Sequence, residues 1–272
     1  MSMNEPNVNE PKVKIGNAPK PPAKTKMIFT IILVVALLWW SSFKTESSIA
    51  DLTIGFPNMF DLLVQMWPPN WHYFENILEP MLETIRMAVI GTTFGAIIAV
   101  PLALLCASNI IRNSWIVYPF RFILNLIRTI PDLLLASIFV AIFGLGALPG
   151  IIALSIFSIG LVAKLLYEAI ESIDPGPLEA MTAVGANKVQ WVFFGVIPQV
   201  TAHFTSYVLY TFEVNVRAAA ILGLVGAGGI GEYYDKTLGF LEYDKTASII
   251  IMTLIVVLVI DYMSTKLREK LL

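Results

Sequence analysis

Residues 179–198 read EAMTAVGANKVQWVFFGVIP, and this stretch decides how the rest of the chain is interpreted. An Asp-Pro pair at 174–175 precedes it and predicts the cap and the first turn of a helix. Gly185 stands where a left-handed residue ends such a helix. Asn187 and Gln190 form a capping-box signal for a second helix, which the proline that closes the stretch stops or kinks. We therefore expect a short helix, a glycine corner and a second helix.

The composition of the chain indicates an all-α membrane protein. Hydrophobic residues make up 57% of the sequence and charged residues 14%, whereas soluble domains carry about 25% charged residues. The sequence has no basic stripe, so we expect no nucleic-acid partner. Its single cysteine, Cys106, excludes a disulfide framework and a cysteine-based metal site. His72 and His203 lie far apart in sequence, which leaves a histidine metal pair open but favours two unrelated polar side chains.

Six apolar segments are long enough to cross a bilayer as helices. They are Met27–Phe43, Thr84–Ala107, Ile116–Phe143, Ile151–Leu166, His203–Leu224 and Ser248–Met263. The third is interrupted at 128–132, so we expect a tilted or interfacial part before the span itself. The first also fits the core of a signal peptide, but the long polar tail before it and the lack of a clear cleavage site favour a retained helix.

The polar segments between the spans predict which side of the membrane each loop occupies. The tail 1–26 is basic and has little to bury, so we expect it to be disordered and cytoplasmic. Segment 44–79 is acidic and contains aromatic residues, which is typical of amphipathic pieces on the outer surface. Arg112, Lys188 and the basic C-terminus 266–272 then fall inside, as the positive-inside rule requires. The N-terminus and the C-terminus are therefore both expected on the cytoplasmic side of the membrane.

Ionisable and polar residues interrupt the fifth span. Buried charges within a span are costly and are functional candidates by default. Glu213 and Arg217 are four residues apart, so they share a helix face and can pair. A structural ion pair that orients helices is an equal alternative to a role in the pore. The candidate translocation path comprises Arg128, Pro131, Glu213, Asn215 and Arg217.

A glycine-rich block follows the fifth span. Its glycines are Gly223, Gly226, Gly228, Gly229 and Gly231. The spacing matches the GxGxxG pattern of dinucleotide-binding folds, but no strand precedes it. The sequence also lacks a GK[ST] motif, so we expect no ATP on a P-loop of this chain. We interpret residues 223–246 as a flexible outer loop at the mouth of a pore.

Residues 179–198 resemble the EAA loop of the membrane subunits of bacterial ABC importers. The match is carried by the coupling-loop residues Glu179, Ala180, Met181, Gly185, Ala186 and Pro198. Met181 departs from the pattern, since the family has alanine there. The loop, the Arg128–Pro131 stretch and the block FEVNVRAAAILGLVGAGGIG at 212–231 together resemble the permease of phosphonate importers, from about Glu79 to the end of the chain.

This resemblance implies a fold and a set of partners. The fold would be a type I, MetI-like permease core at 80–265 with an extra N-terminal span, and the coupling loop would occupy 174–198. The short helix would dock on a cytoplasmic ATPase dimer, which binds ATP and Mg, while this chain binds no cofactor or metal and is not an enzyme. Two copies would form the pore in the bacterial inner membrane. An extracytoplasmic phosphonate-binding protein would supply the substrate.

Other functions remain open on the sequence alone. Within the same class, the solute could be phosphite, phosphate or methionine, because selectivity resides in a different protein. An ATP-independent channel or secondary transporter would work without an ATPase. A membrane enzyme would need clustered catalytic groups at one interface, and the sequence shows only scattered ones.

Overall fold

The computed structural model describes residues 24–45 and 49–271, and the regular elements in these ranges are all helices. The tail predicted to be disordered, 1–26, therefore lies outside the described residues except at its end. The chain divides into two units, residues 1–61 and 62–272. In the first unit, α1 (Lys24–Lys44) coincides with the first predicted span. Its apolar side chains are exposed all round the helix, as suits a helix that crosses lipid.

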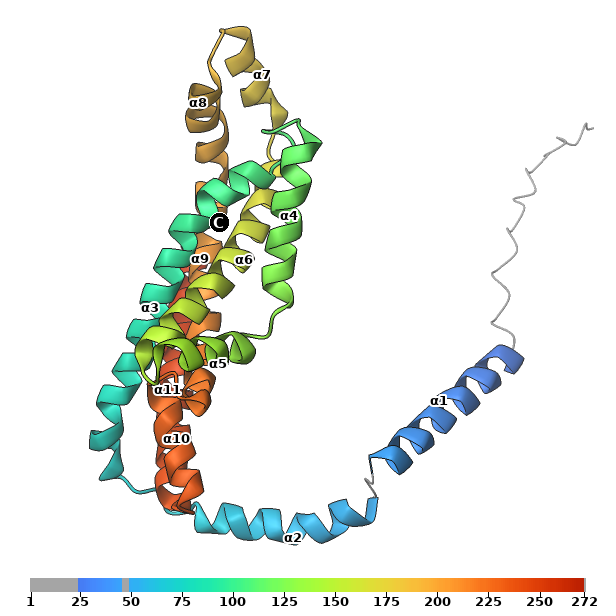
Figure 1. Ribbon diagram of the computed structural model, residues 1–272, viewed down its shortest axis with the longest axis vertical. Coiled ribbons are helices and arrows are strands. Elements are labelled where there is room, and N and C mark those ends of the chain that lie inside the picture. The colour runs from blue at the N-terminus through green and yellow to red at the C-terminus, as the bar shows by residue number, and fades with distance from the viewer. Residues whose placement is uncertain (1–23, 46–48, 272) are drawn as a thin grey trace, which may run out of the picture. The chain divides into compact units, whose positions relative to one another are not determined.

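As far as it is described (residues 62–271), the second unit contains six helices of 12 or more residues that begin after its boundary. These are α3 (Tyr73–Cys106), α4 (Ser114–Thr129), α5 (Asp132–Phe143), α6 (Ala147–Glu171), α9 (Ile197–Leu222) and α11 (Tyr243–Leu271). The shorter elements are α7 (Pro175–Ala183), α8 (Lys188–Gln190), the π-helical turn η1 (Trp191–Val196), the 3₁₀ turn η2 (Gly223–Val225) and α10 (Ile230–Gly239). A further helix, α2 (Ile49–Gln65), runs across the boundary between the units. Within the second unit, α7 and α8 stand at one end and α10 stands at the other (Figure 1).

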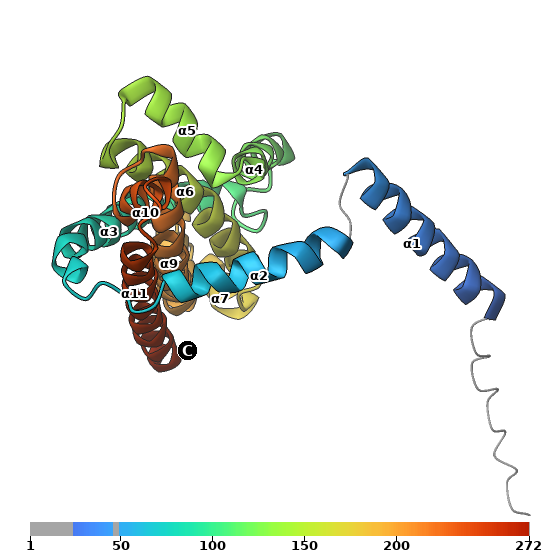
Figure 2. The ribbon, with the colours of Figure 1, turned by 90° about the horizontal axis from the view of Figure 1, so that it is seen from below.

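Five of the described helical segments are long and apolar enough to cross a membrane. They are Thr25–Lys44, Tyr73–Cys106, Ala147–Glu171, Lys188–Val225 and Tyr243–Leu271. α4 and α5 meet at an angle of 86° and add a sixth crossing if the pair is one broken span. In the end view, α4 is seen nearly along its axis while α5 runs across the picture (Figure 2). The predicted interruption at 128–132 is therefore confirmed.

Gly91 and Gly95 bring α3 into close contact with α6, because small residues let helix backbones approach. A Cβ atom built on Gly91 would lie 2.7 Å from Leu154 Cβ, and one on Gly95 would lie 2.3 Å from Ser158 Cβ. Neither position has room for a side chain. α9 packs on both α3 and α6, and α11 packs on α9. These contacts place the core of the unit along α3, α6 and α9.

Several predicted boundaries are wrong, because tertiary packing extends the helices. α3 begins at Tyr73 instead of near Thr84, so the predicted outer segment 44–79 is divided between α2 and the first turns of α3. Ile77 and Met81 in those turns are buried against Ile230 and Ile249. A helix with such an apolar face is stabilised by packing more than by local propensity.

Candidate functional site

The segment 174–198 folds as a hairpin, here called the coupling hairpin, whose local signals act as predicted. The Asp174 carboxylate caps α7 by accepting a hydrogen bond from Gly176 N at 2.9 Å. Gly185 has a φ of +75°, the left-handed conformation that ends a helix without strain in glycine. Asn187 and Gln190 form a complete capping box, with bonds of 2.9 and 3.0 Å. Side chain–backbone bonds thus fix both sides of the corner.

The two arms of the hairpin are packed together by a tryptophan. Trp191 Nε1 donates to the carbonyl oxygen of Leu178 at 3.1 Å. The Leu178 side chain is buried against the second arm, where a Cβ on Gly195 would lie 2.8 Å from Leu178 Cδ2. The hairpin is therefore a packed element and not a loose loop.

Pro198 does not stop the second arm, which corrects one expectation. The π-helical turn η1 precedes it and leads directly into α9, so that 188–225 is one helical run. Pro198 falls at the second position of α9. A missing N–H costs little at the first turn of a helix. α9 therefore begins at Ile197 and not near His203.

The coupling-loop residues predicted from the sequence lie largely on the exposed surface of the coupling hairpin. Glu179, Ala180 and Gly185 are exposed, and Met181 and Ala186 are half-buried. Apolar side chains are also exposed on this hairpin: Val184 is 78% exposed, Val189 is 66% exposed and Phe193 is 61% exposed. Exposed apolar residues grouped on one projecting element indicate a contact surface for another protein.

A groove separates the coupling hairpin from the turn between α3 and α4. It has a volume of about 600 Å³ and is lined by Asn109, Arg112, Pro175, Leu178, Glu179, Thr182, Ala183 and Trp191. An adjoining hollow of about 320 Å³ includes Arg112 and Lys188. Arg112 and Lys188, which the positive-inside rule assigns to the same side, thus lie at one end of the unit.

Glu213 and Arg217 pair on α9, as their spacing predicts, and a third residue joins them. Arg217 Nη2 donates to Glu213 Oε1 at 2.6 Å, and Arg268 Nη2 donates to Glu213 Oε2 at 3.1 Å. The Glu213 side chain is 7% exposed, whereas that of Arg217 is 45% exposed. Two guanidinium groups share one carboxylate, so the cluster carries a net positive charge. Sequence reasoning treated Arg268 only as part of a basic terminus, because nothing local links it to α9.

Asn215 lies apart from this cluster, among α3, α6 and α9. Its Nδ2 donates to Thr92 Oγ1 and to Ser158 Oγ, both at 2.7 Å. The side chain is fully buried, and its Oδ1 has no hydrogen-bond partner among the residues described. In this position Asn215 joins three helices of one chain; its assignment to a translocation path stays a prediction.

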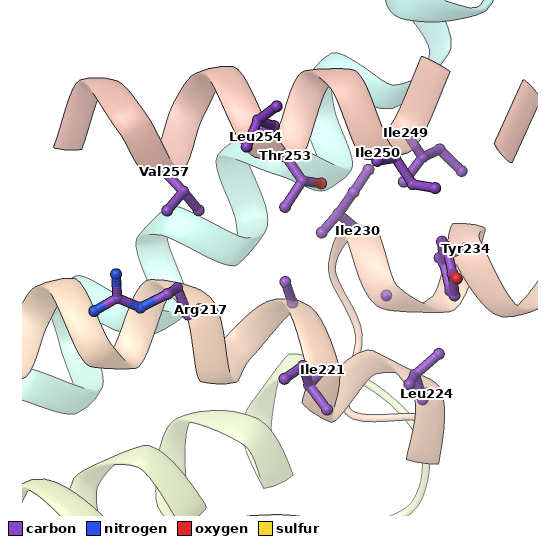
Figure 3. A pocket seen from close by; sticks show the side chains of 12 residues that line it. Arg217, Ile221, Leu224, Ile230, Tyr234, Ile249, Ile250, Thr253, Leu254 and Val257 are labelled. Atoms are coloured by element: carbon purple, nitrogen blue, oxygen red, sulfur yellow. The ribbon is translucent and has the colours of Figure 1, made fainter. Parts of the chain in front are cut away.

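Arg217 also lies at one end of an apolar groove between α9, α10 and α11. The groove has a volume of about 480 Å³, and its walls include Ile221, Ile230, Ile250 and Leu254. Arg217 and Tyr234 are seen at opposite ends of it (Figure 3). The groove thus places one cationic side chain among mainly aliphatic walls.

Arg128 and Pro131 mark the junction of α4 and α5. Pro131 is the N-cap residue of α5, where a missing N–H is tolerated. Arg128 is exposed, and its aliphatic stem lies over Gly160 of α6, where an added Cβ would come within 2.8 Å of Arg128 Cγ. The five candidate path residues therefore do not form one cluster: Glu213 and Arg217 are paired, while Asn215 and Arg128 contact other elements.

The glycine-rich block forms a tight turn. The prediction of a long loop at 223–246 is wrong. Residues 230–239 form α10, and α11 begins at Tyr243. Gly226, Gly228 and Gly229 have positive φ values between 70° and 84°. Gly146 N donates to Gly226 O at 2.9 Å, and Ile230 N donates to Thr84 Oγ1 at 2.8 Å. The block is thus anchored to neighbouring elements.

Close packing explains the other two glycines of the block. A Cβ on Gly231 would lie 2.1 Å from Ala220 O, and one on Gly223 would lie 2.6 Å from Gly228 O. Both glycines let backbone segments touch. The ranges 24–45 and 49–271 contain no group of three or more His, Cys, Asp or Glu side chains placed to hold a metal.

Comparisons with known proteins agree on one family. Residues 91–271 match the model of the family described as binding-protein-dependent transport system inner membrane component. The phosphite transport system permease protein PtxC of Stutzerimonas stutzeri is 32% identical over 243 residues, which cover 89% of this chain and 86% of that protein. HtxC of the same species is 37% identical over 262 residues, covering 96% and 93%. A solved structure of the MetNI methionine ABC transporter in an inward-facing conformation matches with a TM-score of 0.65 at 22% identity, covering 72% of this chain and 96% of the matched one.

Proposed function

This chain belongs to the family of binding-protein-dependent transport system inner membrane components, and we propose that it is the permease subunit of an ATP-driven ABC importer for phosphonate-type small anions. The observation that carries the proposal is the coupling hairpin. It is packed internally, caps its own corner and exposes Glu179 and Val184 on a projecting surface. Such an element suits docking on a cytoplasmic ATPase.

The energy source and the partners follow from this assignment. ATP and Mg are bound by the partner ATPase, and this chain contributes no catalytic site. A second copy of the chain completes the pore, and an extracytoplasmic binding protein delivers the solute. The hairpin end, with Arg112 and Lys188, faces the cytoplasm, in line with the positive-inside rule. The C-terminus and the N-terminal tail lie on that same side of the bacterial inner membrane.

The choice of substrate rests on charge and on the relatives. PtxC is by its name a phosphite permease. Moving an oxyanion through hydrocarbon unaided is prohibitively costly. The cluster of Glu213, Arg217 and Arg268 offers a net positive charge at a partly exposed guanidinium, which lowers that cost without a strong trap. Phosphite and phosphate remain alternatives within this chemistry, and so does methionine, which carries a carboxylate.

The test is uptake by the complete complex in proteoliposomes that contain the ATPase and the binding protein. Glu179→Arg and Gly185→Trp are expected to insert normally but to uncouple solute uptake from ATP hydrolysis. Phe240→Ala, at an exposed site near α10, is the matched control and should transport normally. Uptake by the Glu179 and Gly185 variants equal to the parent would contradict the coupling role. Uptake by the parent without an ATPase would favour a channel or secondary transporter.

A further inference from the structure

An ionic cluster lies where the coupling hairpin leaves α6. Glu171 is the last residue of α6, and Asp174, the cap of α7, follows three residues later. Glu171 Oε1 accepts a hydrogen bond from Ser108 N at 2.7 Å, and it also accepts from the Ser108 hydroxyl and from Arg121 Nη2. Ser108 belongs to the turn after α3 and Arg121 to α4. One carboxylate thus joins three elements at the root of the hairpin.

Arg121 is held on more than one side. Its Nε and Nη2 donate to the carbonyl oxygen of Cys106 at 2.9 and 2.7 Å. Its guanidinium carbon lies 4.6 Å from the centre of the Tyr167 ring. About a quarter of each side chain of the Arg121–Glu171 pair is exposed. A planar guanidinium in such a site is not replaced by lysine without loss of geometry.

A second bond reinforces the same junction. Asn109 Nδ2 donates to the carbonyl oxygen of Ile170 at 2.6 Å, so the turn after α3 also holds the end of the α6 backbone. On the other arm, Gln199 Oε1 accepts from Asp174 N at 3.1 Å, and Gln199 Nε2 donates to Gly195 O at 2.7 Å. The root of the hairpin is therefore hydrogen-bonded to α9 through Gln199 and to the turn between α3 and α4 through Asn109.

α4 depends on Arg121 for its polar attachment to this junction. Among residues 24–45 and 49–271, the side-chain hydrogen bonds that tie α4 to other helices and turns are those of Arg121 and the N-cap bond from Trp115 N to Asn113 Oδ1. The opposite face of α4 is open, with Trp115, Tyr118 and Phe122 all exposed. From Arg121 the helix runs to the 86° break before α5. A displacement of the hairpin root would therefore be carried through α4 to the break between α4 and α5.

We infer that the Arg121–Glu171 pair is the positioning link that passes displacement of the coupling hairpin to α4 and the α4–α5 break. This inference rests on the proposed function, since it presumes that an ATPase moves the hairpin. The pair does not contact the solute or the ATPase. It acts by making the hairpin root, the turn after α3 and α4 move as one body. Ion pairs and hydrogen bonds that connect rigid elements are one way in which coupling is carried between distant sites.

The test measures solute taken up per ATP hydrolysed by the assembled complex in proteoliposomes, with methylphosphonate, phosphite and orthophosphate as probes. Arg121→Gln and Glu171→Gln are each expected to lower this ratio at least about tenfold while ATPase binding is retained. The double variant should be no worse than the poorer single variant, because residues that act through one contact are not additive. Lys236→Gln is the matched control, since Lys236 pairs with Glu232 within α10 and that pair belongs to neither α4 nor the hairpin.

A distance measurement on the assembled complex tests the link independently of solute uptake. Spin labels at Tyr118 on α4 and at the exposed Phe194 on the second arm of the hairpin, in a Cys106→Ala background, should keep one separation in the parent with and without ATP. In Glu171→Gln the separation should change or broaden on ATP binding. An unchanged uptake ratio in both single variants, or an equal loss in Lys236→Gln, would overturn this inference alone. A parent complex with no ATP-driven uptake of any probe would overturn the proposed function and this inference together.

Discussion

Glu213 of α9 accepts a hydrogen bond from Arg268 of α11, at 3.1 Å between Oε2 and Nη2, across 55 residues of sequence. Its second oxygen accepts from Arg217, four residues further along α9. One turn earlier in each helix, Ser264 Oγ donates a hydrogen bond to the carbonyl oxygen of Leu209 at 3.4 Å. The buried carboxylate thus binds the last turns of α11 to the middle of α9, and one positive charge remains unneutralised.

Replacement of Glu213 by alanine is expected to destabilise the protein strongly. The change leaves two guanidinium groups without their shared carboxylate, and removal of one partner of a buried ion pair costs about 3–5 kcal/mol. Unfolding by denaturant in detergent micelles would measure the difference. Glu269→Ala is the control, because Glu269 pairs with Lys266 at an exposed site, where such pairs contribute about 0–1 kcal/mol. Equal losses in the two variants would show that the Glu213 cluster contributes no special stability.

Gly231→Ala is expected to destabilise the turn before α10, although alanine favours a helix. The new Cβ would lie 2.1 Å from Ala220 O, so backbone must move. Overpacking of this kind costs about 1–3 kcal/mol. Gly239→Ala, in the same helix but with no atom within 4 Å of its Cβ, should be neutral or slightly stabilising. Thermal unfolding of both variants would compare them, and a Gly231→Ala protein as stable as the parent would refute the close contact.

The sequence predicts the coupling hairpin well because its determinants are local. Asp174, Gly185, Asn187 and Gln190 act within two to three residues of their partners. The break at 128–132 is likewise local, since a proline and polar residues interrupt an apolar run. The pairing of Glu213 with Arg217 follows from helical spacing alone.

Long-range contacts explain what the sequence could not predict. Arg268 and Glu171 find partners 55 and 50 residues away, and no spacing rule connects them. The early start of α3 depends on Ile77, which packs on residues from α10 and α11. The length of α9 depends on a π-helical turn that places Pro198 where its missing N–H costs little. The partners of Arg268 and Glu171 and the start of α3 are decided by elements that meet only in the folded chain, whereas the π-helical turn is a local feature that the sequence signals do not predict.

Asn215 is expected to couple energetically to Ser158 by a modest amount. The Ser158 hydroxyl donates to the Leu154 carbonyl at 2.7 Å and accepts from Asn215 Nδ2, so the bond joins α6 to α9. Hydrogen bonds between membrane helices contribute about 0.6 kcal/mol on average, with a maximum of about 1.7. A double-mutant cycle of Asn215→Ala and Ser158→Ala would measure this coupling free energy.

The control cycle for Asn215 replaces Ser155, one turn earlier in α6. Ser155 donates only to the Ile151 carbonyl of its own helix, at 2.7 Å. Its coupling to Asn215 should be close to zero, because the two side chains share no hydrogen bond. A Ser155 cycle as large as the Ser158 cycle would mean that the effect arises from general loosening of α6 and not from the bond.

The orientation of the protein can be tested by cysteine labelling. Cys106, the single native cysteine, is fully buried and should react slowly with a membrane-impermeant maleimide. Val184 at the end of α7 and Phe240 at the end of α10 are 78% and 77% exposed. α7 and α10 stand at opposite ends of the second unit (Figure 1). Val184→Cys should react only when the reagent is inside the cell, and Phe240→Cys only when it is outside. Labelling of Val184→Cys in intact cells would place the hairpin on the outer side, where no cytoplasmic ATPase can reach it.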